Sequence, residues 1–184
     1  DTFVGQLAER FSALRVGSAS QDLDLGPVVN ATQQKRIESY LDIARRDNLP
    51  ILAEGAFGSN VPTGGYYVKP TLIGDVPPDH VLAQEEIFGP VLVACRFRDE
   101  DDALRIANGT PYGLAAGVWT SDLGRSMRLS HKIQSGQVFV NNYGAGGGIE
   151  LPFGGMKASG HGREKGFEAL FAFGAVKTVT IKHG

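Results

Sequence analysis

The sequence predicts a layered α/β domain with a largely parallel sheet. Short apolar segments alternate with amphipathic helical segments along the chain, and this alternation is typical of parallel strands joined by crossover helices. The length of 184 residues fits one ordinary domain. With 42% hydrophobic and 21% charged residues, the composition is that of a globular protein that can bury a core.

Five segments carry helical signals. Phe3, Leu7 and Phe11 recur at helical spacing, so they share one face of the first helix. Asn30 has the side chain of an N-cap, and Asp99 opens a helix whose acidic first turn suits the helix dipole. The apolar stripe of the second helix consists of Ile37, Tyr40, Leu41 and Ala44. The predicted helices cover residues 2–15, the region from 30 to Pro50, 99–107, 121–134 with Ser121 as its cap, and 164–173.

Apolar or extended runs between these helices predict the strands. Val91–Phe97 is a continuous apolar run, as expected of a buried strand. Pro70 lies within an extended segment and removes a ladder donor, which predicts an edge strand or a bend there. The predicted strands cover residues 51–53, 66–73, 91–97, 114–120, 138–141 and, as a closing strand, 176–182.

Charge and hydropathy exclude several classes of function. A net charge of −2 with scattered Lys and Arg gives no basic surface for nucleic acid. No apolar run approaches the roughly 20 residues of a membrane span, and no signal-peptide pattern opens the chain. We therefore expect no nucleic-acid or membrane partner and a cytoplasmic location. Because the chain passes directly from Asp1 into a helical pattern, we expect it to be a piece of something longer.

The cysteine and histidine content predicts neither a disulfide framework nor a metal centre. Cys95 is the single cysteine and lies inside the apolar run 91–97, where burial would raise the thiol pKa and make it inert. The four histidines are far apart in the sequence and lack the spacing of metal ligands. We therefore expect no metal.

The segment Gln84–Pro90 places two adjacent carboxylates beside an aromatic ring, a glycine and a proline. A carboxylate at a strand edge can accept hydrogen bonds from sugar hydroxyls, and the ring can pack on a flat ligand. The competing interpretation, favoured by composition alone, is a solvated acidic turn with a buried Phe88. A hydrolase that uses both Glu85 and Glu86 is disfavoured, because neighbouring side chains on an extended segment point to opposite faces.

Two segments near the end of the chain could also line a site. Gly144–Gly148 follows a strand, but Ile149 stands where a dinucleotide fingerprint needs its third glycine. The alternatives are a loop that lines a pocket with Tyr143 and Phe153, or a purely structural turn. Lys157–Glu164 could hold an anion between its amides and cations, although a turn into the last helix is the favoured interpretation.

Motifs from several segments occur together, and in the same order, in one known family. The most specific are E-E-I-F-G-P at 85–90 and P-F-G-G-M-K-x-S-G at 152–160. Others are N-G-T-P-Y-G-L at 108–114, V-N-N at 140–142, G-R-E at 162–164, G-P-V at 26–28, G-Y-Y-V-K-P-T-L at 65–72 and K-T-V at 177–179. Through these motifs the whole chain resembles the C-terminal half of the NAD(P)-dependent aldehyde dehydrogenases.

The resemblance implies a fold, a cofactor, a substrate class and an oligomeric state. It implies a three-layer α/β catalytic domain over residues 1–170, followed over 171–184 by a helix end and a strand of an oligomerisation sheet. The complete enzyme would use NAD or NADP and a small aldehyde, and would form a homo-oligomer. These expectations come from the family and not from composition or spacing.

The resemblance also implies roles for individual residues. Glu86 matches the carboxylate that holds the nicotinamide-ribose hydroxyls, and Phe88 matches the aromatic that packs near the nicotinamide. Gln33 matches a polar residue that reaches the cofactor ribose. Phe153 matches an aromatic of the substrate tunnel, and the loop that begins at Tyr143 and runs to residue 151 matches the aldehyde entrance.

The family's reacting groups are not among the matched residues. In the family, a cysteine thiolate attacks the aldehyde, a glutamate activates water and an asparagine helps hold the oxyanion. All three lie upstream of the matched part, as does the domain that binds most of the cofactor, and Cys95 is in the wrong place. We therefore expect no catalytic residue in this chain, and an inactive chain with weak or absent cofactor binding. The alternative is a non-catalytic assembly module that associates through its closing strand.

Overall fold

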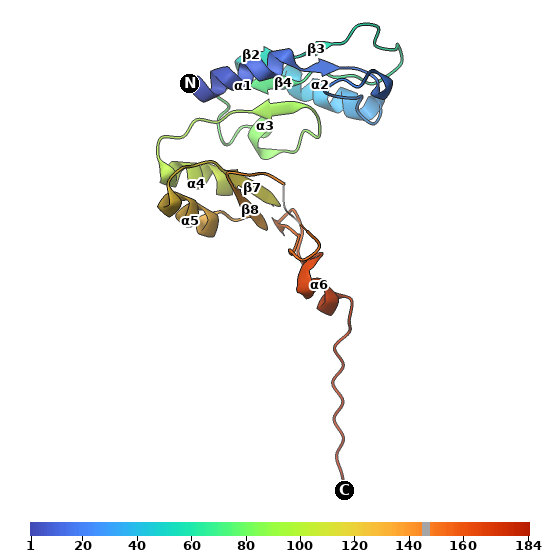
Figure 1. The fold of residues 1–184 in the computed structure, drawn as a ribbon, viewed down its shortest axis with the longest axis vertical. Coiled ribbons are helices and arrows are strands. Elements are labelled where there is room, and N and C mark those ends of the chain that lie inside the picture. Colours follow the sequence, from blue (N-terminus) through green and yellow to red (C-terminus); the bar gives the residue numbers. More distant parts are fainter. Residues whose placement is uncertain (145–147) are drawn as a thin grey trace. The chain divides into compact units, whose positions relative to one another are not determined.

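A computed structural model describes residues 1–144 and 148–184 of the chain (Figure 1). Helices and strands alternate along the sequence, which confirms the predicted α/β class. The chain divides into two units, Asp1–Phe97 and Arg98–Gly184. Each unit contains its own small sheets.

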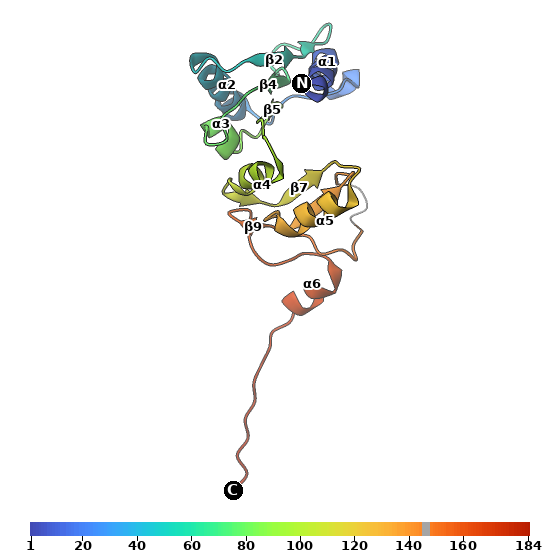
Figure 2. The same cartoon turned by 90° about the vertical axis from the view of Figure 1, so that its left-hand side faces the viewer.

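The first unit is a sheet between two helices. β4 (Thr71–Ile73) pairs antiparallel with β2 (Ile51–Glu54) and parallel with β5 (Val91–Val93). In Figure 2, α1 (Thr2–Ala13) and α2 (Ala31–Arg46) lie on opposite faces of this sheet, which gives three layers. The remaining elements are β1 (Arg15–Val16), which pairs in parallel with β3 (Ala56–Phe57), the 3-10 turn η1 (Ala19–Gln21) and α3 (Val81–Gln84).

The core of the first unit is built around α2. The predicted stripe is confirmed, because Ile37, Tyr40, Leu41 and Ala44 are all buried. These side chains pack with a second set from the loops, β4, α3 and the segment before β5, namely Val68, Ile73, Val76, Leu82 and Ile87. The Asn30 side chain accepts a hydrogen bond from the Gln33 backbone N–H at 2.9 Å. The predicted N-cap is therefore confirmed, and it fixes where α2 begins.

The second unit contains the β–α–β arrangement that the alternation predicts. β7 (Ala115–Val118) pairs in parallel with β8 (Gln137–Val140), and α5 (Leu123–Lys132) connects them and packs on both. A parallel pair needs such a crossover. The remaining elements are α4 (Glu100–Asn108), β6 (Tyr112–Gly113), which pairs antiparallel with β9 (Met156–Lys157), and α6 (Gly166–Ala172).

Several expectations about single elements are wrong. The cap of α5 is Asp122 and not Ser121, because the Asp122 carboxylate accepts the Arg125 N–H at 2.8 Å. β5 ends at Val93, so Cys95 follows the strand instead of lying inside it. β9 is a strand that we did not predict, because its partner β6 is distant in sequence and gives no local signal.

The expected closing strand at 176–182 is also absent, since these residues form neither helix nor strand. A strand needs a neighbour for its N–H and C=O groups, and no described segment of this chain pairs with it. Its pairing with another subunit stays a prediction.

Two properties of the described residues bear on function. No helix among them has both the length and the apolar character that crossing a bilayer requires. In the same part of the chain, no three His, Cys, Asp or Glu side chains lie together in a way that could hold a metal ion.

Asp102 stabilises the start of α4. Its carboxylate is 8% exposed and accepts hydrogen bonds from the Arg105 guanidinium at 2.7 Å and from the Arg98 N–H at 3.2 Å. The bonds from Arg105 first, and from the Arg98 backbone second, hold the pKa of the Asp102 carboxyl below its ordinary value of 3.8. Such a group stabilises the fold above its ordinary pKa, and this stability is lost as the pH falls through the lower, folded pKa.

Replacing Asp102 by asparagine is expected to destabilise the second unit at neutral pH but to make its stability less sensitive to acid. Urea unfolding at about pH 7 and about pH 2 measures both effects, and the two proteins should converge at the lower pH. The Asp101→Asn variant changes an exposed neighbour on the same helix and is the matched control. An unchanged pH dependence in Asp102→Asn would contradict the assignment.

Candidate functional site

The candidate site of the first unit is the Glu85–Gly89 segment, which connects α3 to β5. It lies along one face of α2. Gln33, Arg36, Ile37 and Tyr40 occupy that face, because steps of three and four residues return to the same side of a helix. The structure therefore brings three predicted cofactor residues, Gln33, Glu86 and Phe88, into one place.

Two α2 side chains hold the backbone of the segment. The Gln33 Nε2 donates hydrogen bonds to the carbonyl oxygens of Ile87 at 3.1 Å and Phe88 at 2.9 Å. The Arg36 Nη2 donates to the carbonyl oxygen of Glu86 at 2.8 Å. Ile87 itself is buried in the core. Three successive carbonyls are thus fixed on the helix.

The two adjacent carboxylates have different surroundings, as the alternation of an extended segment predicts. The Tyr40 hydroxyl donates a hydrogen bond to the Glu85 carboxylate at 2.5 Å, and the Arg36 Nη2 donates to the Tyr40 oxygen at 3.2 Å. Glu86 is exposed, and no described residue donates a hydrogen bond to its carboxylate. Glu86 therefore keeps both carboxylate oxygens available to a ligand, whereas one oxygen of Glu85 is bonded to Tyr40.

Phe88 has an unusual backbone. Its φ is +60°, in the left-handed region that a bulky residue rarely adopts, and its side chain is 66% exposed. The expectation of a buried Phe88 in a solvated turn is therefore wrong. Such a conformation costs about 1–3 kcal/mol and persists only where its surroundings enforce it. Here Gln33 bonds the Phe88 carbonyl and Ile87 is buried in the core. In addition, Gly89 lies so close to the Ile37 side chain that a Cβ on Gly89 would be 2.3 Å from it.

Glycine at position 88 is expected to give a more stable protein than alanine, by about 0.5–1 kcal/mol. Both changes remove the ring, but only glycine relieves the left-handed strain, and at most positions alanine is the more stabilising residue. Urea unfolding of Phe88→Gly and Phe88→Ala measures the difference. Alanine equal to or better than glycine would contradict the strained backbone at Phe88.

Two further residues contact the candidate segment and were missed by sequence reasoning, namely Arg36 and Tyr40. Arg36 was not singled out, and Tyr40 was assigned only to the core. The signal that could have found them is their helical spacing from Gln33, because any side chain three, four or seven residues further on shares its face. The contact itself joins residues about 45 positions apart, since Tyr40 bonds Glu85, and it leaves no local mark in the sequence.

The predicted substrate residues lie in the second unit. Phe153 forms a backbone bridge with Glu164, with both N–H···O bonds at 2.7 Å, and the Lys165 Nζ lies 5.6 Å from its ring centre. Tyr143 is 65% exposed, and its ring centre is 5.7 Å from that of Phe139. Residues 145–147 of the glycine-rich loop at 144–148 lie outside the described residues.

The two cationic side chains of the segment 157–164 that could bind an anion donate hydrogen bonds to backbone carbonyls instead. The Lys157 Nζ donates to the carbonyl oxygens of Asn108 at 2.9 Å and Thr110 at 3.2 Å. The Arg163 Nη1 donates to the carbonyl oxygens of Gly155 and Gly162. Both side chains tie loop backbone together, which supports the interpretation of this segment as a structural turn.

Cys95 is partly buried against the core of the first unit. Burial raises the pKa of its thiol above the ordinary value. A raised pKa leaves little thiolate at neutral pH, and the thiolate is the nucleophile. These surroundings agree with a Cys95 that takes no part in catalysis.

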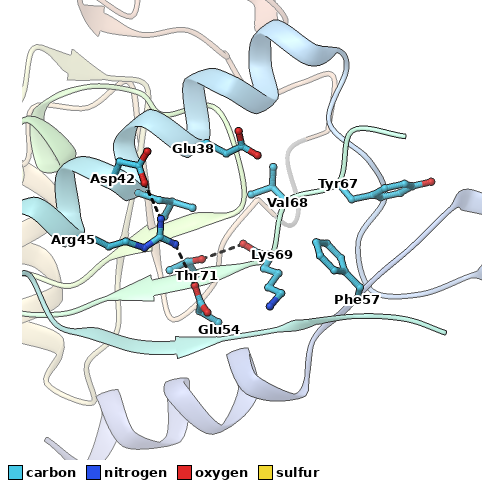
Figure 3. A pocket seen from close by; sticks show the side chains of 10 residues that line it. Glu38, Asp42, Arg45, Glu54, Phe57, Tyr67, Val68, Lys69 and Thr71 are labelled. Atoms are coloured by element: carbon cyan, nitrogen blue, oxygen red, sulfur yellow. Dashed lines mark hydrogen bonds and ion pairs between the residues drawn. The ribbon is translucent and has the colours of Figure 1, made fainter. Parts of the chain in front are cut away.

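A pocket lies on another face of α2 (Figure 3). Its volume is about 420 Å³, and it is lined by α2 and by residues of and around β2, β3 and β4. Its Arg45 is bonded to Asp42 at 2.9 Å and lies 3.9 Å from Glu54, and the Lys69 ammonium lies over the Phe57 ring. The cations of this pocket are therefore already paired.

Comparison with known proteins gives a consistent result. The family model described as "Aldehyde dehydrogenase family" matches residues 1–179. The betaine aldehyde dehydrogenase of Brucella anthropi is 38% identical over 100% of this chain and 38% of its own length. That of Agrobacterium fabrum is 38% identical over 99% of this chain and 37% of its own length. The chain thus spans little more than a third of these relatives.

Solved structures agree with this. The chain superposes with a TM-score of 0.92 and 58% identity on a Burkholderia cenocepacia protein described as an aldehyde dehydrogenase, covering 98% of this chain and 38% of that one. A Bacillus cereus aldehyde dehydrogenase solved as its NAD+ complex has a TM-score of 0.83 and 35% identity, over 92% of this chain and 34% of its own.

Proposed function

The chain belongs to the aldehyde dehydrogenase family, and we propose that it supplies the part of such an enzyme that holds the nicotinamide end of NAD or NADP beside the substrate. The complete enzyme would oxidise an aldehyde to a carboxylic acid. The cofactor would supply the hydride acceptor. Relatives of this chain are described as betaine aldehyde dehydrogenases, and a Bacillus cereus aldehyde dehydrogenase is solved as its NAD+ complex.

The observation that carries the proposal is the pairing of the open Glu86 carboxylate with the exposed Phe88 ring on one rigid segment. A carboxylate accepts two hydrogen bonds at once, so Glu86 can bind the adjacent hydroxyls of a ribose. The Phe88 ring can pack on a flat ring system. The carboxylate acceptor and the exposed ring of this segment therefore fit the nicotinamide riboside end of the cofactor.

The other site residues have narrower roles in this proposal. Gln33 has both a donor and an acceptor in its amide. Its Nε2 is used on the segment backbone, and its Oε1 can accept a bond from a ribose hydroxyl. Phe153 and Tyr143, with the rest of the loop 143–151, would line the passage of the aldehyde.

The reacting groups would come from the part of the family that this chain does not match. We propose no catalytic residue here and expect the chain alone to be inactive and to bind cofactor weakly or not at all. In the complete enzyme, residues 1–170 would belong to the catalytic domain, 171–184 would contact a neighbouring subunit of a homo-oligomer, and the location would be the cytoplasm.

One observation favours the second candidate function, an assembly module. The last helix and the residues after it expose a row of apolar side chains, namely Phe167, Leu170, Phe171, Phe173, Val176, Val179 and Ile181. An exposed apolar surface of this kind commonly marks a protein contact. Light scattering tests this second candidate, since a monomer at high concentration would count against assembly through this surface.

The direct test is a chimera in which this chain replaces the matching part of the Burkholderia cenocepacia relative. The chimera is expected to form NADH or NADPH from a simple aldehyde, and the 184-residue chain by itself is expected to form none. The unmodified relative is the control. A chimera that assembles like the relative but reduces neither cofactor would overturn the proposal. Turnover by the chain alone would overturn the expected inactivity.

A further inference from the structure

Glu85 lies next to the proposed ribose ligand but has a different partner. The Tyr40 hydroxyl, on a side chain that is 7% exposed, donates to the Glu85 carboxylate, and Arg36 donates in turn to the Tyr40 oxygen. The Arg36 guanidinium also lies 5.4 Å from the Tyr40 ring centre. A hydrogen bond to an ionised partner is stronger than a neutral one and has a preferred direction.

This bond differs from the other contacts between α2 and the segment. Gln33 and Arg36 hold backbone carbonyls, whereas Tyr40 holds a side chain. The backbone at Glu85 is extended, with φ −113° and ψ 148°. Side chains of neighbouring extended residues point to opposite faces. Fixing the Glu85 side chain on α2 therefore directs Glu86 away from the helix.

We propose that Tyr40 and Glu85 are positioning residues of the cofactor site. Their hydrogen bond, supported by Arg36, sets the direction of the Glu86 carboxylate and, together with the Gln33 bonds to the segment backbone, is needed to maintain the left-handed backbone at Phe88. Glu85 itself does not contact the cofactor. The inference rests on the proposed function of the segment, so its experiment has one part that needs no activity.

The first part measures the backbone of Phe88 in the 184-residue chain. Carbon-13-labelled phenylalanine gives Cα and Cβ shifts that report φ and ψ. The parent is expected to show left-handed values at Phe88, and Tyr40→Phe to move them toward extended values. Tyr67→Phe removes the same atom from a ring in the pocket of Figure 3 and is expected to change nothing. Left-handed values retained in Tyr40→Phe would overturn the proposal.

The second part measures hydride transfer in the chimera. Misplacing a reacting group slightly can cost up to about 100-fold in rate, and we expect Tyr40→Phe and Glu85→Gln to lower kcat by about tenfold. The KM for the aldehyde should stay the same, and the kinetic isotope effect with a deuterated aldehyde should rise because hydride transfer becomes slower. A merely structural role would lower the melting temperature and leave the isotope effect unchanged.

The combined variant separates the remaining alternatives. If Tyr40 acts through Glu85, Tyr40→Phe with Glu85→Gln should be no slower than either single variant. Additive losses would mean that Glu85 acts independently, for example as a direct ligand, and would overturn the proposal. If the parent chimera is inactive, the proposed function fails, and the Phe88 shifts still decide whether Tyr40 positions the segment.

Discussion

Alanine at position 136 is expected to lower the free energy of unfolding of the second unit by about 3 kcal/mol. A Cβ on Gly136 would lie 1.7 Å from the carbonyl oxygen of Gly154 and 2.8 Å from its carbon. Both are backbone atoms, so no side chain can move aside. The Gly136 N–H also donates to the Gly113 carbonyl at 2.9 Å. The backbone at Gly136 therefore cannot move away from Gly154 without losing that hydrogen bond.

The matched control for this variant is Gly124→Ala in α5. There a Cβ meets only the ends of two flexible side chains, Arg128 and Asp122, at 3.2 Å. Alanine inside a helix is favoured over glycine by up to about 1 kcal/mol, so this variant should be neutral or more stable. Urea unfolding measures both. A Gly136→Ala protein as stable as the parent would contradict the close packing of the 152–160 motif against Gly136.

Replacing Glu86 by glutamine in the chimera is expected to lower kcat/KM for the cofactor by about 10- to 100-fold. The amide keeps the shape of the carboxylate but has only one acceptor oxygen and no charge, so it cannot bind two ribose hydroxyls equally well. Steady-state kinetics with varied NAD+ and NADP+ measure the loss. The control is Glu38→Gln, an exposed carboxylate on the pocket face of α2. Equal kinetics of Glu86→Gln and the parent would exclude the ribose contact.

Local patterns predict the elements that depend on local chemistry. The α2 helix is predictable because Asn30 caps it and its apolar residues repeat at helical spacing. The β7–α5–β8 unit is predictable because apolar runs flank an amphipathic segment. The opposite directions of the Glu85 and Glu86 side chains follow from the alternation of an extended segment. In each case the determining residues lie close together in the sequence.

The features that sequence reasoning missed depend on distant contacts. Phe88 has a left-handed backbone in a segment held by contacts with distant α2 residues, Gln33 among them, and no periodicity encodes such contacts. The Tyr40–Glu85 bond and the β6–β9 pairing each join segments about 45 residues apart. The closing segment 176–182 has a strand pattern but no partner in the described part of this chain. Ser121 and Asp122 are both good caps, and only the position of the Arg125 N–H decides between them.

In the proposed function, this chain contributes the carboxylate that holds the nicotinamide ribose. The most direct measurement is a crystal structure of the chimera with bound NAD+. We expect the Glu86 carboxylate within hydrogen-bond distance of both ribose hydroxyls and the Phe88 ring against the nicotinamide. Ribose hydroxyls bound by other residues, with Glu86 left in solvent, would rule out this role of Glu86.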